Sequence, residues 1–299
     1  MFVRLAGTLG APDHWVTIPL LGAFPWFATW ALVVAVVCVV LWRRSRATWR
    51  TAVAALVVAS MGLVLLVPRT VASTQPVATG EVVTVAAVNV RIGAADTDVV
   101  ALLAIDLGVD LLAVVEATPM SSEALMAGPL GTALPIHEHA TTDVGGIVLA
   151  QGALTPLAGL PHAGGTPDVL WTTPGGTEVA VTTVHASAPT GPTSTERWRE
   201  GLARTPGPAA GPSLVLGDLN ATVDHETFRS ILATGWRDAA VEAGSGLAPT
   251  YDGLFDASPG LPMAIDHALV SPGIAVRSFA AHDVPGTDHR LIVTMLQLP

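Results

Sequence analysis

The chain has 299 residues, enough for one large domain or two small ones. Its residues are 51% hydrophobic and only 13% charged, about half the charged fraction of ordinary soluble domains. It contains no lysine and has a net charge of −10, which argues against a protein that grips DNA non-specifically through a basic face. The single cysteine, Cys38, excludes an intrachain disulfide and leaves the redox compartment open.

Two uncharged stretches near the N-terminus predict membrane-spanning helices. They run from Phe24 to Trp42 and from Thr51 to Val67, each close to the ~20 residues that cross a bilayer as a helix. Four arginines lie between them at 43–50, and positive charge in a short loop favours the cytoplasmic side. A signal peptide fits less well, since its apolar core is only about 7–15 residues long; two buried core helices are the other alternative. We therefore predict a multi-pass protein of the cell membrane.

In this orientation the N-terminal segment 1–23 and everything after Val67 lie outside the cytoplasm. Residues 68–79 form a polar linker rich in Pro, Ser, Thr and Gln. The charge changes at the same boundary: residues 1–76 hold six Arg and one Asp, whereas residues 77–299 hold eight Arg against 23 Asp and Glu. We expect residues 80–299 to form one acidic extracytoplasmic domain.

Apolar runs of strand length recur through this domain between turn signals. The predicted strands are Val82–Val90, Leu111–Glu116, Gly146–Ala150, Glu178–His185, Leu214–Asp218, His267–Val270 and Leu291–Leu296. The predicted helices are Asp96–Leu107, Ser121–Met126, Thr195–Ala203 and His225–Leu232. Many strands with few helices between them favour two packed mixed sheets with helices outside, a four-layer α/β/β/α sandwich. The Gly- and Pro-rich stretches 151–176 and 186–212 predict loops.

Polar residues end five of the apolar runs. They are Asn89, Glu116, His185, the sequence Gly217-Asp218-Leu219-Asn220, and the pairs Asp266-His267 and Asp288-His289. Most of these signals have a structural alternative: Asn89 a turn former, Glu116 a salt-bridge partner, His185 a structural histidine, and Asp218 to Asn220 an Asx turn. Two Asp-His pairs flanking one apolar hairpin are harder to explain in that way. Their joint occurrence favours a single site.

The residue types in this set indicate the chemistry. An Asp beside a His can orient the imidazole so that it acts as a base. Carboxylate and amide oxygens suit a hard cation such as Mg²⁺. The chain offers no Gly-x-Ser-x-Gly elbow and no cysteine nucleophile. The residues therefore predict hydrolysis of a phosphate ester by water at a divalent metal.

In this order along the chain, the set resembles the endonuclease/exonuclease/phosphatase superfamily, over about residues 80–299. The resemblance implies the four-layer sandwich and a Mg²⁺-dependent enzyme, with Mn²⁺ or Ca²⁺ as alternative ions. The membrane part is similar to the N-terminal anchor of some bacterial members, which often has three helices where this chain has two. That comparison leads us to expect a late start and a missing first helix.

The resemblance also implies a role for each residue. Glu116, Asn89 and Asp288 are the implied metal ligands. His185 stabilises the phosphoryl oxygens, Asp218 orients or deprotonates the attacking water, and Asn220 holds the phosphate. His289 polarises the water or the phosphate. Either Asp266 or Asp288 fixes the His289 tautomer, and the family pattern favours Asp266.

Three departures from the family pattern bear on the substrate. Gln151-Gly152 stands where many relatives have Ser-Arg, Leu219 replaces a frequent Phe, and Thr250-Tyr251 replaces Thr-Trp. The chain also lacks a basic loop that could grip DNA. The expected substrate is a phosphate ester: a lipid headgroup, a small phosphoester or DNA. Alternatives are an extracellular nuclease acting on DNA and a non-catalytic surface module that keeps the fold. Besides the substrate, the lipid bilayer is the expected partner, and no obligate protein partner is expected.

Overall fold

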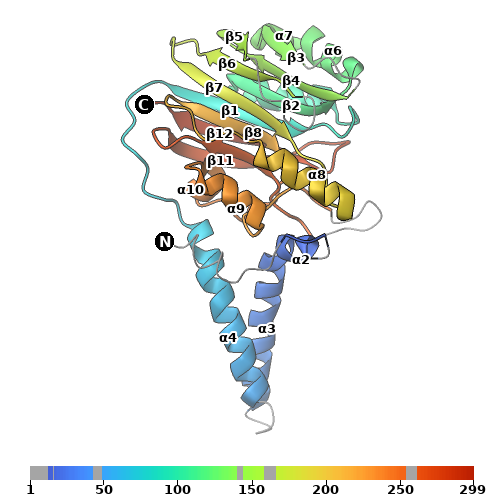
Figure 1. Cartoon of the computed structure of the whole chain (residues 1–299), viewed down its shortest axis with the longest axis vertical. Helices are drawn as coiled ribbons and strands as arrows, with labels where there is room; N and C mark the ends of the chain where they lie inside the picture. Colours follow the sequence, from blue (N-terminus) through green and yellow to red (C-terminus); the bar gives the residue numbers. More distant parts are fainter. Residues whose placement is uncertain (1–12, 16, 43–48, 140–143, 158–165, 254–260) are drawn as a thin grey trace.

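The computed structural model describes residues 13–15, 17–42, 49–139, 144–157, 166–253 and 261–299. Two sheets are packed face to face, with helices covering their outer faces, and a pair of long helices projects away from this body (Figure 1). The predicted four-layer α/β/β/α sandwich is therefore confirmed.

The first sheet has the strand order β11-β12-β1-β2-β4-β3, and the second has the order β5-β6-β7-β8-β10-β9. Each sheet is mixed, because β1 and β2 are parallel in one and β7 and β8 are parallel in the other. The strands of the first sheet are β1 (Val82–Asn89), β2 (Leu111–Ala117), β3 (Ile136–His139), β4 (Gly145–Ala150), β11 (Ala275–Asp283) and β12 (Arg290–Gln297). Those of the second are β5 (Ala153–Pro156), β6 (Asp168–Thr172), β7 (Glu178–His185), β8 (Ser213–Asp218), β9 (Arg237–Asp238) and β10 (Asp266–Val270).

The central strands are buried on both faces, which explains their continuous apolar sequences. In β1, Val85 and Ala87 pack into the core between the sheets, whereas Ala86 and Val88 face the outer helices. Helices α5 (Thr97–Asp106), α6 (Pro119–Ala127) and α7 (Pro129–Ala133) cover the first sheet. Helices α8 (Pro192–Ala203) and α9 (Glu226–Ala233) cover the second, and the short helix α10 (Ala239–Glu242) follows β9.

The projecting pair consists of α3 (Phe24–Trp42) and α4 (Trp49–Leu66), preceded by α2 (Ile18–Gly22) and followed by the 3₁₀ turn η2 (Val67–Thr70). Both long helices are long and apolar enough to cross a membrane, over Phe24–Leu41 and Thr51–Thr70. They approach closely, since a Cβ on Gly62 would lie 2.6 Å from the Cβ of Ala28. Most of the predicted basic loop, residues 43–48, lies outside the described residues.

Three sequence-based expectations are wrong. The stretch 151–176, predicted as a loop, contains β5 and β6. The stretch 186–212 is not a loop throughout: it contains the predicted helix as α8, which starts at Pro192, three residues before the expected Thr195. The two Asp-His pairs do not flank one hairpin: β10 lies in the second sheet, whereas β11 and β12 form a hairpin in the first. The chain crosses between the sheets after β10, so the two pairs reach the same edge from different layers.

Candidate active site

The strand directions bring the predicted residues to one edge of the sandwich. Because β1 and β2 are parallel, and β7 and β8 are parallel, each pair ends at the same edge of its sheet. The antiparallel strands β10 and β12 begin there, beside the ends of β8 and β1. Within the second sheet, Asp218 is directly opposite His185 on one side and Asp266 on the other. Three predicted site residues thus stand side by side.

Unusual backbone conformations direct two predicted side chains, those of Glu116 and Asn220, toward the site. Glu116 has a φ of +54° and lies where the β2–β4 register shifts, and such bulges re-aim side chains beside active sites. Asn220 has a φ of +47°. Gly217 has a φ of +132°, and a Cβ there would lie 2.1 Å from the carbonyl oxygen of Val184, so only glycine fits between β7 and β8. Non-glycine residues with positive φ persist only where their surroundings hold them.

One half of the site is partly open to solvent. The Asn89 amide nitrogen donates to Glu116 Oε1 at 2.9 Å and to Asp218 Oδ2 at 3.0 Å. His185 Nε2 lies 3.1 Å from Glu116 Oε1, and the Ile92 amide donates to Oε2 at 3.0 Å. Both Glu116 oxygens are therefore oriented. The nitrogen of Asn89, rather than its oxygen, faces the carboxylates, so in this structure Asn89 orients Glu116.

These contacts fix the charges of Glu116 and His185. Burial opposes the ionisation of Glu116, but hydrogen bonds from His185 and Asn89 outweigh it and lower the pKa of Glu116 to about 2. Burial likewise disfavours the charged form of His185, but the bond to Glu116 and the nearby Asp218 raise the His185 pKa above its ordinary value. The contact therefore favours the anionic carboxylate of Glu116 and the protonated imidazole of His185.

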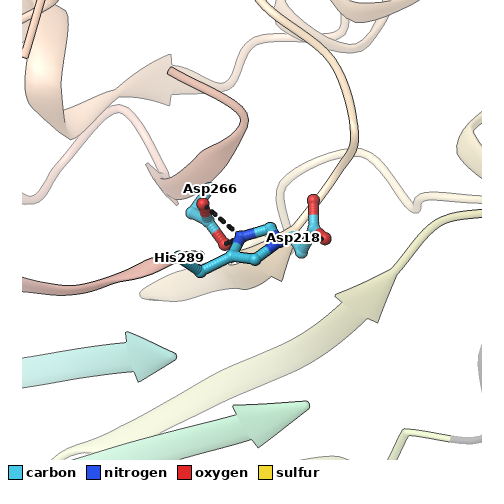
Figure 2. A group of neighbouring side chains, drawn as sticks. All are labelled: Asp218, Asp266 and His289. Carbon is cyan, nitrogen blue, oxygen red and sulfur yellow. Dashed lines mark hydrogen bonds and ion pairs between the residues drawn. The ribbon is translucent and has the colours of Figure 1, made fainter. Parts of the chain in front are cut away.

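The other half is buried, and Figure 2 shows the His289 ring between two carboxylates. His289 Nδ1 lies 3.0 Å from Asp266 Oδ2 and 3.1 Å from Oδ1, and Nε2 lies 3.8 Å from Asp218 Oδ2. Ligand atoms of these three residues all lie within 4.8 Å of one another. Asp266, rather than Asp288, is therefore the carboxylate that contacts His289 Nδ1.

The charges of this buried half follow from the same contacts. Burial works against a charged His289, but Asp266 and Asp218 outweigh it and raise the His289 pKa to about 10. Burial and the neighbouring Asp266 raise the pKa of Asp218, while His289 opposes this rise. In the absence of a metal, a proton is held on His289 between two acids.

Threonine hydroxyls and backbone amides support the buried half. Thr250 Oγ1 accepts from the amides of Ile265 and Asp266 at 3.0 and 2.9 Å. Thr287 Oγ1 donates to the Asn89 carbonyl at 2.9 Å and accepts from the His289 amide at 3.1 Å. From the sequence, Thr250-Tyr251 was a departure from the family pattern and a candidate lining of the pocket, whereas Thr287 was given no role. Threonine directly before an Asp-His pair was the available signal for Thr287.

Asn220 holds Asp218 in place. Its amide donates to Asp218 Oδ1 at 2.8 Å, and its side-chain nitrogen donates to Asp218 Oδ2 at 3.1 Å and to the Ala186 carbonyl at 2.9 Å. The aromatic ring of Tyr251 lies against His289, with ring centroids 4.8 Å apart. Asn220 and Tyr251 thus border the group formed by Asp218 and His289.

Two members of the Asp-His pairs lie elsewhere. The Asp288 carboxylate lies 3.8 Å from Arg91 Nε and is not one of the three clustered residues. His267 points to the opposite face of β10 from Asp266, as neighbours in a strand do. Its Nδ1 lies 2.8 Å from Asp238 and its Nε2 lies 2.8 Å from the Ala221 carbonyl. His267 is thus a buried structural residue.

The chain matches the model of the Endonuclease/Exonuclease/phosphatase family over residues 86–289, more than half of its length. It belongs to this family. The matched range includes every residue of the site described above, so the resemblance noted in the sequence is confirmed.

Solved structures agree with the family's fold. A family member from Beutenbergia cavernae is 19% identical, with a TM-score of 0.59 over 73% of this chain and 72% of that chain. The D. rerio protein TDP2 in complex with a single-strand DNA product is 14% identical, with a TM-score of 0.58 over 72% and 99%. A member from Bacteroides vulgatus is 16% identical, with a TM-score of 0.53 over 73% and 100%. Among curated proteins, no sequence matches this chain.

Proposed function

We propose that this protein is a membrane-anchored, Mg²⁺-dependent phosphohydrolase that cleaves phosphodiester or phosphomonoester bonds by in-line attack of water. The convergence of Glu116, His185, Asp218, Asp266 and His289 at one edge of the two sheets carries this proposal. The family membership, which implies hydrolysis of phosphoesters, supports it.

The donor set at the open half fits a hard divalent cation. Glu116 is ionised, and its side chain is 20% exposed, whereas the carboxylates of the other half are almost fully buried. Mg²⁺ binds through one or two carboxylates and keeps several waters. Glu116 would hold the ion, with Asn89 fixing the carboxylate's orientation; when bound, the ion would neutralise charge on a phosphoryl oxygen.

The other residues handle the water and the phosphate. Asp218 would orient the attacking water and accept its proton, and the burial that raises its pKa makes it a better base. His185 and His289, both with raised pKa, would donate to phosphoryl oxygens as negative charge develops. Asp266 fixes the His289 ring through Nδ1. Asn220 would hold the phosphate, as the family pattern implies.

The location follows from the helical pair. Only 11% and 24% of the apolar windows in α3 and α4 are buried within the protein, which fits lipid-facing helices better than core helices. With the basic segment 43–50 in the cytoplasm, the catalytic domain over residues 80–299 would lie outside it. An acidic domain close to a bilayer favours lipid headgroups or small phosphoesters over DNA.

The experiment measures hydrolysis of bis-p-nitrophenyl phosphate by the full chain in detergent, with Mg²⁺ and with EDTA. We expect activity that EDTA abolishes and that His289→Ala and Asp218→Ala each remove. Activity unchanged by both substitutions would remove the mechanism. A panel of plasmid DNA, sphingomyelin, phosphatidylinositol phosphates and simple phosphomonoesters then identifies the substrate class. Inactivity on the whole panel would favour a non-catalytic module.

A further inference from the structure

Helix α9 begins six residues after Asn220, and a residue from the far N-terminus caps it. Asp13 Oδ1 accepts from the Glu226 amide at 3.0 Å, and Oδ2 accepts from the Thr227 amide at 2.6 Å. The N-cap residue of α9, His225, makes no side-chain cap of its own. First-turn amides have no partner within the helix, and a carboxylate there also interacts favourably with the helix dipole. Asp13, itself only 2% exposed, therefore completes α9 from 213 positions away.

The same N-terminal segment holds the turn before α9 through His225. His225 Nδ1 accepts from the Thr222 amide at 2.8 Å, and Nε2 lies 3.0 Å from the carbonyl oxygen of Ile18. Burial lowers the pKa of His225, which keeps the neutral form with one accepting and one donating nitrogen. Ile18 also packs in the hydrophobic cluster of α8 and α9. The segment before α3 is thus seated in the domain rather than lying loosely beside it.

The segment after α4 holds this turn from its other side. Arg69 makes two hydrogen bonds to Asp224, with Nη1–Oδ2 at 2.8 Å and Nη2–Oδ1 at 2.6 Å. Both side chains are about nine-tenths buried, and removing one partner of a buried pair leaves the other charge uncompensated. The Arg69 carbonyl also accepts from the Gly246 amide at 2.9 Å. Segments from both ends of the helical pair therefore contact residues 224–227 directly.

Polar contacts, rather than close packing, hold the helical pair against the domain. A cavity of about 300 Å³ lies between the start of α3 and the loops that contain Asp224 and Met263. Across it, the Trp26 indole donates to the Pro262 carbonyl at 3.0 Å. Because the space is incompletely filled, loss of one hydrogen-bonded contact is not compensated by tight surrounding contacts. The Asp13 and Arg69 contacts should therefore have measurable effects.

We propose that Asp13 and Arg69 are positioning residues for the catalytic site, acting through residues 221–227 on the left-handed turn at Asn220 and hence on Asp218. The inference rests on the proposed function for the roles of Asp218 and Asn220. Asn220 holds Asp218 through its backbone and side-chain nitrogens, and its φ of +47° persists only where the surrounding structure imposes it. The helical pair with its flanking segments is thus part of the active-site scaffold as well as an anchor.

Hydrogen exchange of the metal-free full chain in detergent tests this inference without using activity. The informative amides are those of Leu219, which donates to the Ile265 carbonyl, and of Asn220, which donates to Asp218. The variants are Asp13→Ala and Arg69→Ala, with Asp13→Asn and Arg69→Lys as conservative versions. Two controls are Asp96→Ala, which removes the cap of α5, and Arg277→Ala at an exposed position of β11.

We expect Asp13→Ala and Arg69→Ala to raise exchange at Leu219 and Asn220 roughly tenfold, the scale of a lost helix cap. The conservative variants should recover part of the protection, and the controls should leave these two amides unchanged. Exchange that rises only at Glu226 and Thr227, with Leu219 and Asn220 still protected, would reduce Asp13 to a local cap and overturn the proposal. If Arg69→Ala does not fold, Asp13→Ala decides alone.

Kinetics separate this inference from the proposed function. In an active wild-type protein, Asp13→Ala should lower kcat for bis-p-nitrophenyl phosphate with little change in KM, because the turn orients Asp218 rather than binding the ester. Unchanged kcat together with a protected Asn220 would defeat the positioning role alone. A wild-type protein inactive on every phosphoester, but with the expected exchange pattern, would defeat the proposed function and leave the structural coupling established.

Discussion

The two halves of the site differ in their access to water. The side chains of Glu116 and His185 are 20% and 23% exposed, whereas Asp218, Asp266 and His289 are 1%, 2% and 8% exposed. The open half stabilises an anionic carboxylate with a pKa of about 2, and the buried half stabilises a protonated imidazole with a pKa of about 10. In the proposed function, the cation and the ester would approach the open half, and the buried half would handle proton transfer.

The Asn89 side chain touches both halves. Its amide nitrogen donates to Glu116 and to Asp218, so the two carboxylates are held at a fixed separation without direct contact. Buried carboxylates are costly unless paired, and here His289 supplies the compensating charge for both acids of the buried half. Substitutions in the two halves should consequently differ in both size and kind.

The largest expected difference is between the two histidines. His289→Ala should lower kcat/KM for bis-p-nitrophenyl phosphate by about 10³–10⁴-fold, because it removes a positioned imidazole and leaves Asp218 and Asp266 unpaired. His185→Ala should cost about 10²–10³-fold, since solvent can partly replace its hydrogen bonds. His282→Ala on β11 is the matched control and should change kcat/KM less than twofold. Equal losses at His185 and His289 would contradict the division between the halves.

Asp266→Asn tests the buried half by a smaller chemical change. The amide keeps the shape of the side chain but removes the charge that holds the His289 proton, so we expect kcat/KM to fall by about 10²–10³-fold. The His289 pKa should fall from about 10 toward its ordinary value, which an NMR titration of the metal-free protein can follow. Asp98→Asn, on the exposed first turn of α5, serves as the control.

The sign of the associated stability change follows from this raised pKa. Because the pKa of His289 is higher in the folded than in the unfolded protein, protonation of His289 stabilises the fold. This stabilisation is complete below about pH 6.5 and is lost as pH rises through about 10. The difference in denaturation midpoint between the wild type and Asp266→Asn should therefore shrink as pH is raised toward 10. A difference that grew with pH would show that His289 is not the proton-holding group.

The fold could be predicted where a strand is buried on both faces. The continuous apolar sequences of β1, β2 and β8 signal burial whatever their neighbours are. Two strands that were not predicted, β5 and β6, lie at or next to a sheet edge. Strand β5 is largely exposed along its length, and β6 alternates buried and half-buried residues inside a Gly- and Pro-rich stretch. A strand paired on one side only, as β5 is, or interrupted by half-buried residues, as β6 is, leaves a weak signal in a single sequence.

The site could be predicted from strand ends, but the partner of His289 could not; only the family resemblance favoured Asp266. Asn89, Glu116 and Asp218 each end an apolar run, which was enough to bring them to one edge. Which Asp orients His289 depends on β10 and β12 lying in different sheets, a fact absent from local sequence. The contact of Asp13 with α9 depends on how distant segments dock and has no local signal at all.

Glu116→Gln tests the open half and should act mainly on the metal. Glutamine keeps an oxygen acceptor but loses the charge, so the Mg²⁺ concentration for half-maximal activity should rise by about 10–100-fold. Because the pKa of Glu116 is about 2, the effect should be the same at every pH from 5 to 9, roughly the range in which enzymes are assayed. Glu123→Gln on α6 is the control. Activity that high Mg²⁺ does not restore would move the metal site away from Glu116.

The smallest expected effect comes from Thr250→Val, which probes how firmly the buried half is held. The substitution removes the hydroxyl that accepts from the Ile265 and Asp266 amides and leaves two buried donors unpaired, at a cost of about 1–3 kcal/mol in unfolding free energy. We expect kcat to fall about three- to tenfold, because Asp266 loses its fixed backbone and His289 its fixed orienter.

Thr294→Val is the matched control for this substitution. Thr294 is equally buried, and its hydroxyl donates to the Ser278 carbonyl within the first sheet, so the variant should lose similar stability while keeping kcat. Equal loss of kcat in both variants would mean that activity follows global stability. A loss of kcat confined to Thr250→Val would show that catalysis depends on the exact position of the Asp266 carboxylate. The burial of Asp266 and its short contact with His289 lead us to expect this result.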